Sequence, residues 1–189
     1  MYLDDALLYN QGYMISINDL DSPLFYLFDY DSRSFKINMS FQHFHQFHEI
    51  HILLSGRASH IIEGDYYTLQ PYDIVLLRPS LLHSTEYPAG GDCRRLIINF
   101  RVPDDSPVLH EMLQSCLQPF GAEMPIYRFT GETRAQAFSH LNEIFTLGKQ
   151  PMTPLTQQFI HCHFLQFLAT VAQHAGESSY EPQELSDSI

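Results

Sequence analysis

The sequence has few basic residues. Among its 189 residues there are only 10 lysines and arginines against 22 aspartates and glutamates, which gives a formal net charge of −12. No basic cluster is larger than Arg94-Arg95. Nucleic-acid binding depends on lysine and arginine side chains that neutralise phosphates. We therefore expect that this chain does not bind DNA by itself.

Long apolar runs and paired cysteines are also missing. No run of 18 apolar residues occurs, so no membrane span is predicted. The N-terminus (residues 1–5) has neither the basic nor the apolar region of a signal peptide. Cys93, Cys116 and Cys162 form no CxxC motif and are odd in number, which predicts free thiols in a reducing compartment. These features favour a cytoplasmic protein.

The first part of the chain has the pattern of a β protein. The hydrophobic fraction of 44% is ample for the core of one domain. Short runs of β-branched and aromatic residues alternate with turn residues between Ser22 and Pro103. The predicted strands cover residues 24–30, 34–40, 49–54, 58–63, 66–69, 74–77 and 95–101. Strands without helices between them pair antiparallel, so we expect a sandwich or a small barrel.

After Pro103 the hydrophobic period becomes helical. Helices are predicted at residues 108–117, 134–147 and 156–174, with a short strand at 124–129. The broad apolar faces of the last two helices predict packing against a second copy of the chain, although they could instead cap the barrel. We expect charged substitutions at Phe159 or Phe167 to yield monomers.

The histidine-rich segment that begins at His43 carries the strongest functional pattern. His43 and His45 are two residues apart and share one face of a strand, since side chains alternate with period 2. Glu49 and the distant His83 can join them if the sheet curls. Such a set could hold a first-row divalent metal or line a polar pocket.

The spacing His43-x-His45-x3-Glu49-x6-Gly56 matches the first cupin motif. Residues 47–87 and 94–100 resemble the effector domain of AraC-type transcriptional regulators. The resemblance implies a mainly β fold, a cupin-like antiparallel β barrel followed by a C-terminal α-helical hairpin. Two departures concern the turns, because Tyr72 and Ser80 stand where the family usually has glycine.

The resemblance divides the chain into three parts. Residues 1–103 would form the effector-binding barrel with an N-terminal arm, in which Tyr9, Tyr13 and Met14 could fold over the ligand. Residues 104–175 would form the helical dimerisation segment with one short strand. Residues 176–189 would be a linker toward a helix-turn-helix domain that the sequence lacks, so DNA would be bound only through that absent domain.

The resemblance also assigns the site. A small molecule, for example a sugar, would bind in the barrel, and the chain would be a homodimeric sensor and not an enzyme. The ligand-binding residues would be His43, His45, Glu49, His51, His83 and Arg95. Four of them, His43, His45, Glu49 and His83, would hold Zn, Ni, Fe or Mn if a metal is bound. The alternative is a stand-alone metal-dependent cupin enzyme, a dioxygenase or a sugar isomerase.

Other residues have weaker assignments. Phe41, Tyr66 and Arg78 are further candidates for the pocket lining. His48 is expected to face solvent, and His60 could equally lie in the pocket or on the surface of a strand. His161 and His163 do not share a helix face, so we expect them at an interface or on the surface and not at a metal.

Overall fold

The computed structural model describes residues 12–22, 24–33, 38–103, 105 and 107–182. Two antiparallel sheets form its β part. The larger sheet contains β1 (Tyr13–Ile17), β2 (Tyr26–Arg33), β3 (His48–Ser55), β6 (Ile74–Leu77), β8 (Cys93–Phe100) and β9 (Ile126–Tyr127). The smaller sheet contains β4 (Ala58–Ile62), β5 (Asp65–Leu69) and β7 (His83–Glu86). The predicted antiparallel, mainly β architecture is confirmed.

The strand order explains how distant segments meet. The larger sheet has the order β1-β2-β8-β3-β6-β9, and the smaller sheet has the order β5-β4-β7. A hydrophobic cluster with members from β3, β4, β5 and β6 fills the space between the two sheets. The sheets therefore face each other, and alternate residues of their strands point into the space between them.

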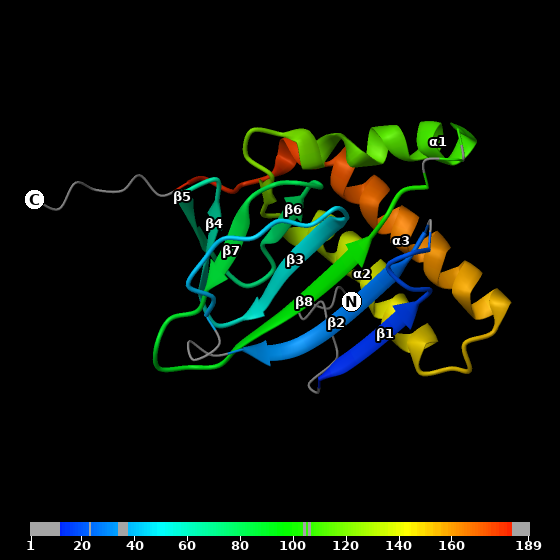
Figure 1. Ribbon diagram of the computed structural model, residues 1–189, viewed down its shortest axis with the longest axis horizontal. Helices are drawn as coiled ribbons and strands as arrows, with labels where there is room; N and C mark the ends of the chain where they lie inside the picture. Colours follow the sequence, from blue (N-terminus) through cyan, green and yellow to red (C-terminus); the bar gives the residue numbers. More distant parts are fainter. Residues whose placement is uncertain (1–11, 23, 34–37, 104, 106, 183–189) are drawn as a thin grey trace, which may run out of the picture.

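Three α-helices lie beside the sheets, and the second and third of them cover the other face of the larger sheet (Figure 1). They are α1 (Pro107–Leu117), α2 (Gly131–Gly148) and α3 (Pro154–Gln173). The side chains of Phe138 and Phe145 on α2, and of Phe164 and Phe167 on α3, belong to one core with β1, β2 and β8. The wide apolar faces of α2 and α3 are therefore used within the chain, as in the capping alternative.

The N-terminal cap of α3 can be recognised in the sequence. The hydroxyl of Thr153 accepts a hydrogen bond from the Thr156 amide, and Pro154 occupies the first turn, where no amide is required. By contrast, α1 buries only Leu113, while Val108 and Met112 are exposed. Its predicted apolar stripe is therefore only partly used in the described part of the chain.

Several local predictions need correction. Tyr13 and Met14 form the edge strand β1 and not an arm, because β1 pairs along its whole length with β2. Tyr9 lies outside the described residues. The predicted strand at 34–40 lies partly outside them, and Asn38 to Ser40 adopt no strand. Strand β7 was not predicted from the sequence.

Two other observations concern the cysteines and possible membrane-spanning helices. All three cysteines are free thiols, as predicted. In the part of the chain that the structure describes, no helix is both long and apolar enough to cross a membrane.

Candidate functional site in the barrel

A backbone bridge joins the two histidine motifs. The amide of His43 donates to the carbonyl of His83 at 2.8 Å, and the amide of His83 donates to the carbonyl of His43 at 2.9 Å. This antiparallel bridge connects the segment before β3 to the start of β7. Residues that are 40 positions apart in the sequence are thereby brought to one end of the cavity between the sheets.

His45, Glu49 and His83 form a cluster with the geometry of a metal site. One nitrogen or oxygen atom from each residue lies within 4.8 Å of the others. His45 Nε2 lies 3.1 Å from Glu49 Oε2, and His83 Nε2 lies 4.0 Å from Glu49 Oε1. Imidazole nitrogen and carboxylate oxygen together suit Zn²⁺ and other divalent first-row metals.

The second ring nitrogens fix the orientation of both imidazoles. Nδ1 of His45 lies 2.9 Å from the carbonyl oxygen of Phe47, and Nδ1 of His83 lies 2.8 Å from that of Leu81. A carbonyl only accepts, so each Nδ1 carries the proton. Nε2 of each ring is thereby directed toward the Glu49 carboxylate. Metal-binding histidines have the same arrangement, in which a carbonyl holds the distal N–H. The residues present therefore fit a divalent cation.

His43, the fourth predicted metal ligand, lies beside this cluster. Its ring centroid is 4.5 Å from that of His83 but 6.2 Å from that of His45. Its Nδ1 is buried without a hydrogen-bond partner. The structure thus brings three of the four predicted ligands together, and it places His43 at the edge of the group.

His43, Glu49 and His83 border a cavity of about 310 Å³ between the sheets. Its lining residues are Leu27, Asp29, Met39, His43, Glu49, His83, Thr85, Tyr87, Arg95, Ile97 and Asn99. Of these, Arg95 was predicted as a ligand contact. Arg95 Nε and Asn99 Oδ1 are buried and have no hydrogen-bond partner in the described part of the chain. Buried polar atoms normally have partners, so these atoms are available to a polar ligand.

Sequence reasoning missed some lining residues that the strand period could have indicated. Arg95, Ile97 and Asn99 alternate along β8 and face the same side. Opposite them on β2, Leu27 pairs with Asn99, and Asp29 pairs with Ile97. Once Arg95 is assigned to the interior, the alternation of side chains along β8 places Ile97 and Asn99 there as well. The pairing register with β2 then adds Leu27 and Asp29.

Two more imidazoles lie deep between the sheets. His51 on β3 and His60 on β4 are both fully buried, and their ring centroids are 5.2 Å apart. Of the two positions that the sequence left open for His60, the structure shows the interior one, because β4 is covered on the side that carries it. His60 Nδ1 contacts the Thr85 hydroxyl at 3.1 Å, whereas neither ring nitrogen of His51 has a hydrogen-bond partner among the residues that the structure describes.

Burial sets the charge state of this interior. It lowers the pKa of His51 to about 3, with a further decrease from the positive charge of Arg95. It also lowers the pKa of His60 well below the ordinary value, and it lowers the pKa of His43 and His83. For Glu49, burial raises the pKa, but the hydrogen bond with His45 and the nearby imidazoles outweigh it and lower the pKa. The site therefore combines the Glu49 carboxylate with buried imidazoles at His43, His51, His60 and His83 that bind a proton less readily than a free imidazole.

Three predicted pocket residues lie elsewhere. Phe41 and Tyr66 are exposed and border a separate open hollow of about 340 Å³. Arg78 is exposed, and its guanidinium lies 4.0 Å from the carboxylate of Glu63. Aromatic and basic residues were available in many places in the sequence, and only the register of the strands decides which of them face inward.

His48 is also placed differently from its prediction. Its ring stacks on Phe100 at 5.0 Å and meets the edge of Phe120 at 5.1 Å, so it does not simply face solvent. Burial lowers the pKa of His48 to about 4. It borders a cavity of about 670 Å³ between the end of the barrel and α1, outside the histidine cluster.

His161 and His163 lie on α3, as predicted, without a metal-site geometry. The ring of His161 packs against Tyr26 of β2 at 4.8 Å, and that of His163 lies 5.8 Å from His140 of α2. Both are therefore partly covered by neighbouring elements of the same chain.

Comparison with solved structures supports this fold. The chain is similar to apo ToxT K231A from Vibrio cholerae, with 15% sequence identity and a TM-score of 0.52, over 84% of this chain and 60% of ToxT. It is also similar to a cupin protein from Bacteroides fragilis, with 21% identity and a TM-score of 0.40, over 53% of this chain and 84% of that protein. No curated protein matches the chain in sequence.

The comparison with family models is more specific. The model of the AraC-like ligand binding domain matches residues 36–146, which is more than half of the chain. The match contains the histidine cluster, the cavity-lining strand β8 and most of α2. The cupin-like fold and the resemblance noted from the sequence are confirmed, and the chain belongs to the family of AraC-like ligand-binding domains.

Proposed function

We propose that the chain is the effector-sensing and dimerisation domain of an AraC-type transcriptional regulator, and that it binds a small polar molecule in the cavity between its sheets. The carrying observation is the cavity of about 310 Å³, in which buried polar atoms of Arg95, Asn99 and His83 have no hydrogen-bond partner among the described residues. A ligand with several hydroxyl or carboxylate groups, such as a sugar, would satisfy these atoms. The effector would act through a DNA-binding domain outside these residues.

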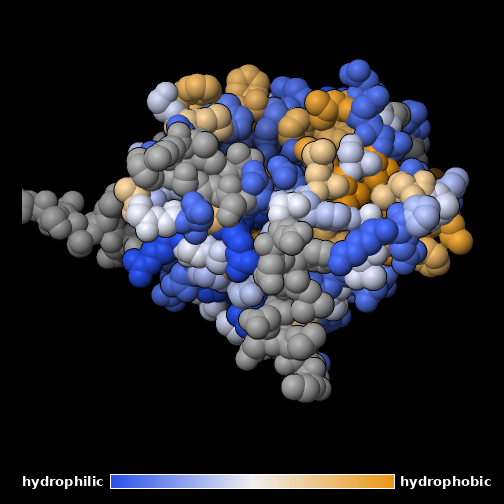
Figure 2. All heavy atoms as spheres, turned by 90° about the horizontal axis from the view of Figure 1, so that it is seen from below, coloured by the Kyte–Doolittle hydropathy of each residue, from blue (hydrophilic) through white to orange (hydrophobic). Residues whose placement is uncertain are grey.

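The proposed homodimer would use apolar surface that the described residues leave exposed. Figure 2 shows hydrophobic side chains gathered toward one end of the molecule, where β1 and the α2–α3 connection lie in Figure 1. Leu155 and Phe159 on the first turns of α3 are exposed, as is Met14 on β1. Exposed apolar residues that gather in this way favour a protein interface.

A metal-dependent cupin enzyme is the second candidate. The converging atoms of His45, Glu49 and His83, with carbonyl-held Nδ1–H groups, favour it. A bound divalent metal would supply Lewis-acid chemistry. In that case the same cavity residues would hold and orient a substrate instead of an effector.

Metal analysis by mass spectrometry, before and after a chelator and alongside a thermal melt, distinguishes these candidates. About one Fe, Mn, Ni or Zn per chain, with a lower melting temperature after removal, would establish the metal site and favour the enzyme. A metal-free protein with an unchanged melt would favour the sensor.

A melt screen with sugars and small metabolites then tests the sensor directly. Ligand-dependent stabilisation should disappear in Glu49→Ala and His83→Ala while the dimer persists. Arg78→Ala is the matched control, because Arg78 is exposed and lies outside the cavity lining. Unchanged ligand responses in both cavity variants would contradict the assignment of this site.

A further inference from the structure

The turn between β5 and β6 has an unusual backbone conformation. Tyr72 in this turn has a φ angle of +74°, which residues other than glycine, asparagine and aspartate seldom adopt. Its amide donates to the carbonyl of Leu53 at 2.6 Å, and the amide of Leu53 donates to the carbonyl of Asp73 at 3.3 Å. The turn is therefore tied directly to β3, and surrounding contacts hold a conformation that the sequence does not favour.

The carboxylate of Asp73 in the same turn is fully buried. Arg128, just after β9, donates to it from Nε and from Nη2, each at 2.7 Å. The amide of Gln70 donates a third hydrogen bond at 2.7 Å. A two-pronged arginine–carboxylate pair of this kind is strong and directional, and a buried carboxylate without it would be costly.

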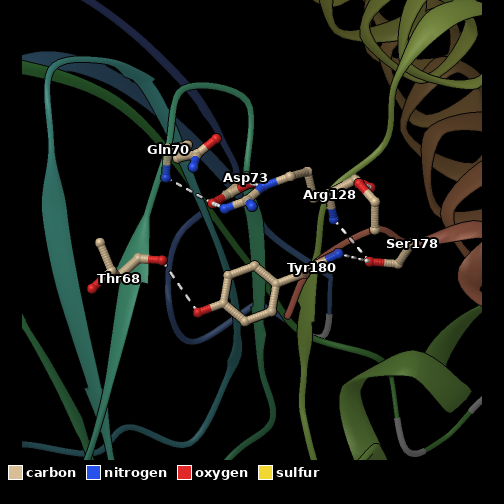
Figure 3. A network of polar contacts seen from close by, with 7 residues as sticks. Thr68, Gln70, Asp73, Arg128, Ser178 and Tyr180 are labelled. Carbon is tan, nitrogen blue, oxygen red and sulfur yellow. Dashed lines mark hydrogen bonds and ion pairs between the residues drawn. The ribbon is translucent and has the colours of Figure 1, made fainter. Parts of the chain in front are cut away.

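The C-terminal segment, which we define as Ser178 to Tyr180, docks on Arg128 (Figure 3). The Ser179 amide donates to the Arg128 carbonyl at 2.9 Å, and the Arg128 amide donates to the Ser178 hydroxyl at 3.0 Å. The Tyr180 ring faces the guanidinium at 5.1 Å, and its hydroxyl donates to the Thr68 carbonyl on β5 at 3.2 Å. Both backbone and side-chain contacts therefore fix this segment on the smaller sheet and on β9.

The turn also continues directly into the candidate site. β6 begins at Ile74, immediately after Asp73, and pairs with β3 so that Val75 lies opposite His51 and Leu77 lies opposite Glu49. Glu49 lines the cavity, and His51 is buried between the sheets. A continuous series of contacts thus runs from the cavity through β3 and Asp73 to Arg128 and the C-terminal segment.

We propose that the turn and the C-terminal segment form a coupling element, in which the docking of the segment depends on the arrangement of the cavity strand β3. The coupling rests on the proposed sensor function. The position of Tyr180 is then fixed by the contacts of the C-terminal segment with Arg128. An effector that shifts β3 would change how firmly this segment is docked. Because coupling is reciprocal, undocking the segment must also loosen the contacts between the turn and β3.

Amide hydrogen exchange, read residue by residue by NMR on the chain without any effector, tests this reciprocity. The informative amides are those of Ser179, Tyr72 and Leu53. Arg128→Lys keeps the charge but removes the two-pronged geometry and the planar surface under Tyr180. We expect the Ser179 amide to exchange about tenfold faster in this variant, and the Tyr72 and Leu53 amides to accelerate with it.

A second variant and a control keep the test decisive. Tyr180→Ala leaves the Asp73–Arg128 pair intact, so it should fold normally, and it should accelerate the same three amides to a smaller extent. Arg78→Lys, at an exposed and long ion pair, should change none of them.

Two results would overturn the proposal. One is a Ser179 amide that exchanges in the parent chain as fast as an unprotected amide. The other is faster exchange at Ser179 in the variants with unchanged exchange at Tyr72 and Leu53. Neither result depends on an effector. Hydrogen exchange therefore tests the coupling, while the melt screen with small molecules tests the sensor function, and either can fail without the other.

Discussion

At the scale of single residues, two non-glycine residues keep the backbone that glycine would otherwise supply. Tyr72 and Ser80 stand where the resembling family usually has glycine, and both have positive φ, +74° and +63°. Both turns therefore have the left-handed backbone that glycine adopts most readily, at residues other than glycine. Ser80 remains in place because its amide donates to the His45 carbonyl at 2.8 Å, next to the candidate metal cluster.

This predicts the effect of restoring glycine at position 80. Ser80→Gly should leave the free energy of unfolding unchanged or raise it by up to about 1 kcal/mol, because relief of left-handed strain exceeds the entropy gained by the unfolded chain. Ser80→Val should lower it by about 1–2 kcal/mol, since a β-branched residue tolerates positive φ least. Urea unfolding of the three proteins measures both. Equal stability of Ser80→Val and the parent would contradict the assigned turn.

At the scale of elements, α2 and α3 pack on the larger sheet through large aromatic side chains. Two phenylalanines of α3 that have the same place in the hydrophobic pattern differ in this packing. Phe167 is 0% exposed in the core of α2, α3 and the larger sheet, whereas Phe159 is 50% exposed. A charge at Phe167 would therefore act on the core of the chain itself, and only Phe159 is placed so that a second chain could cover it. The hydrophobic period shows that both belong to an apolar stripe, but not which part of the stripe another chain covers.

The two substitutions should consequently have different effects. Phe167→Asp should destabilise the fold by more than about 4 kcal/mol, because it removes a buried ring and buries a charge. Phe159→Asp should leave the melting temperature nearly unchanged and shift the proposed dimer toward monomer. Light scattering coupled to size-exclusion chromatography, with a thermal melt of each variant, measures both effects. A folded Phe159→Asp dimer would place the interface elsewhere.

The contact between α3 and β2 should also depend on pH. Burial lowers the pKa of His161, whose ring packs on Tyr26. The folded chain then binds a proton at His161 less readily than the unfolded chain, so this contribution to stability is present above about pH 6.5 and declines as pH falls below it. His161→Phe should reduce the loss of melting temperature between pH 7 and pH 5. An identical loss in parent and variant would contradict this assignment.

At the scale of the whole molecule, the sequence predicted the antiparallel β architecture, the three helices and most cluster residues. Local patterns suffice to predict these features, because the histidine motif has a fixed spacing and the helical period continues over long segments. It did not predict the buried position of His60 or the docking of Ser178 to Tyr180. Those depend on which strand covers which face and on contacts between segments about 50 residues apart, such as Arg128 with Ser178. Only the complete topology determines them.

The charge of the whole molecule carries the last prediction. With a net charge of −12, the chain repels a phosphate backbone, and of its basic residues Arg128 is already engaged with Asp73. We therefore expect no saturable binding of labelled duplex DNA by fluorescence anisotropy, even at about 50 mM salt, where contacts to phosphates are strongest. The control is a basic DNA-binding protein measured with the same duplex. Saturable binding that weakens steeply as salt increases would show a cationic surface and would contradict a purely sensory role for these residues.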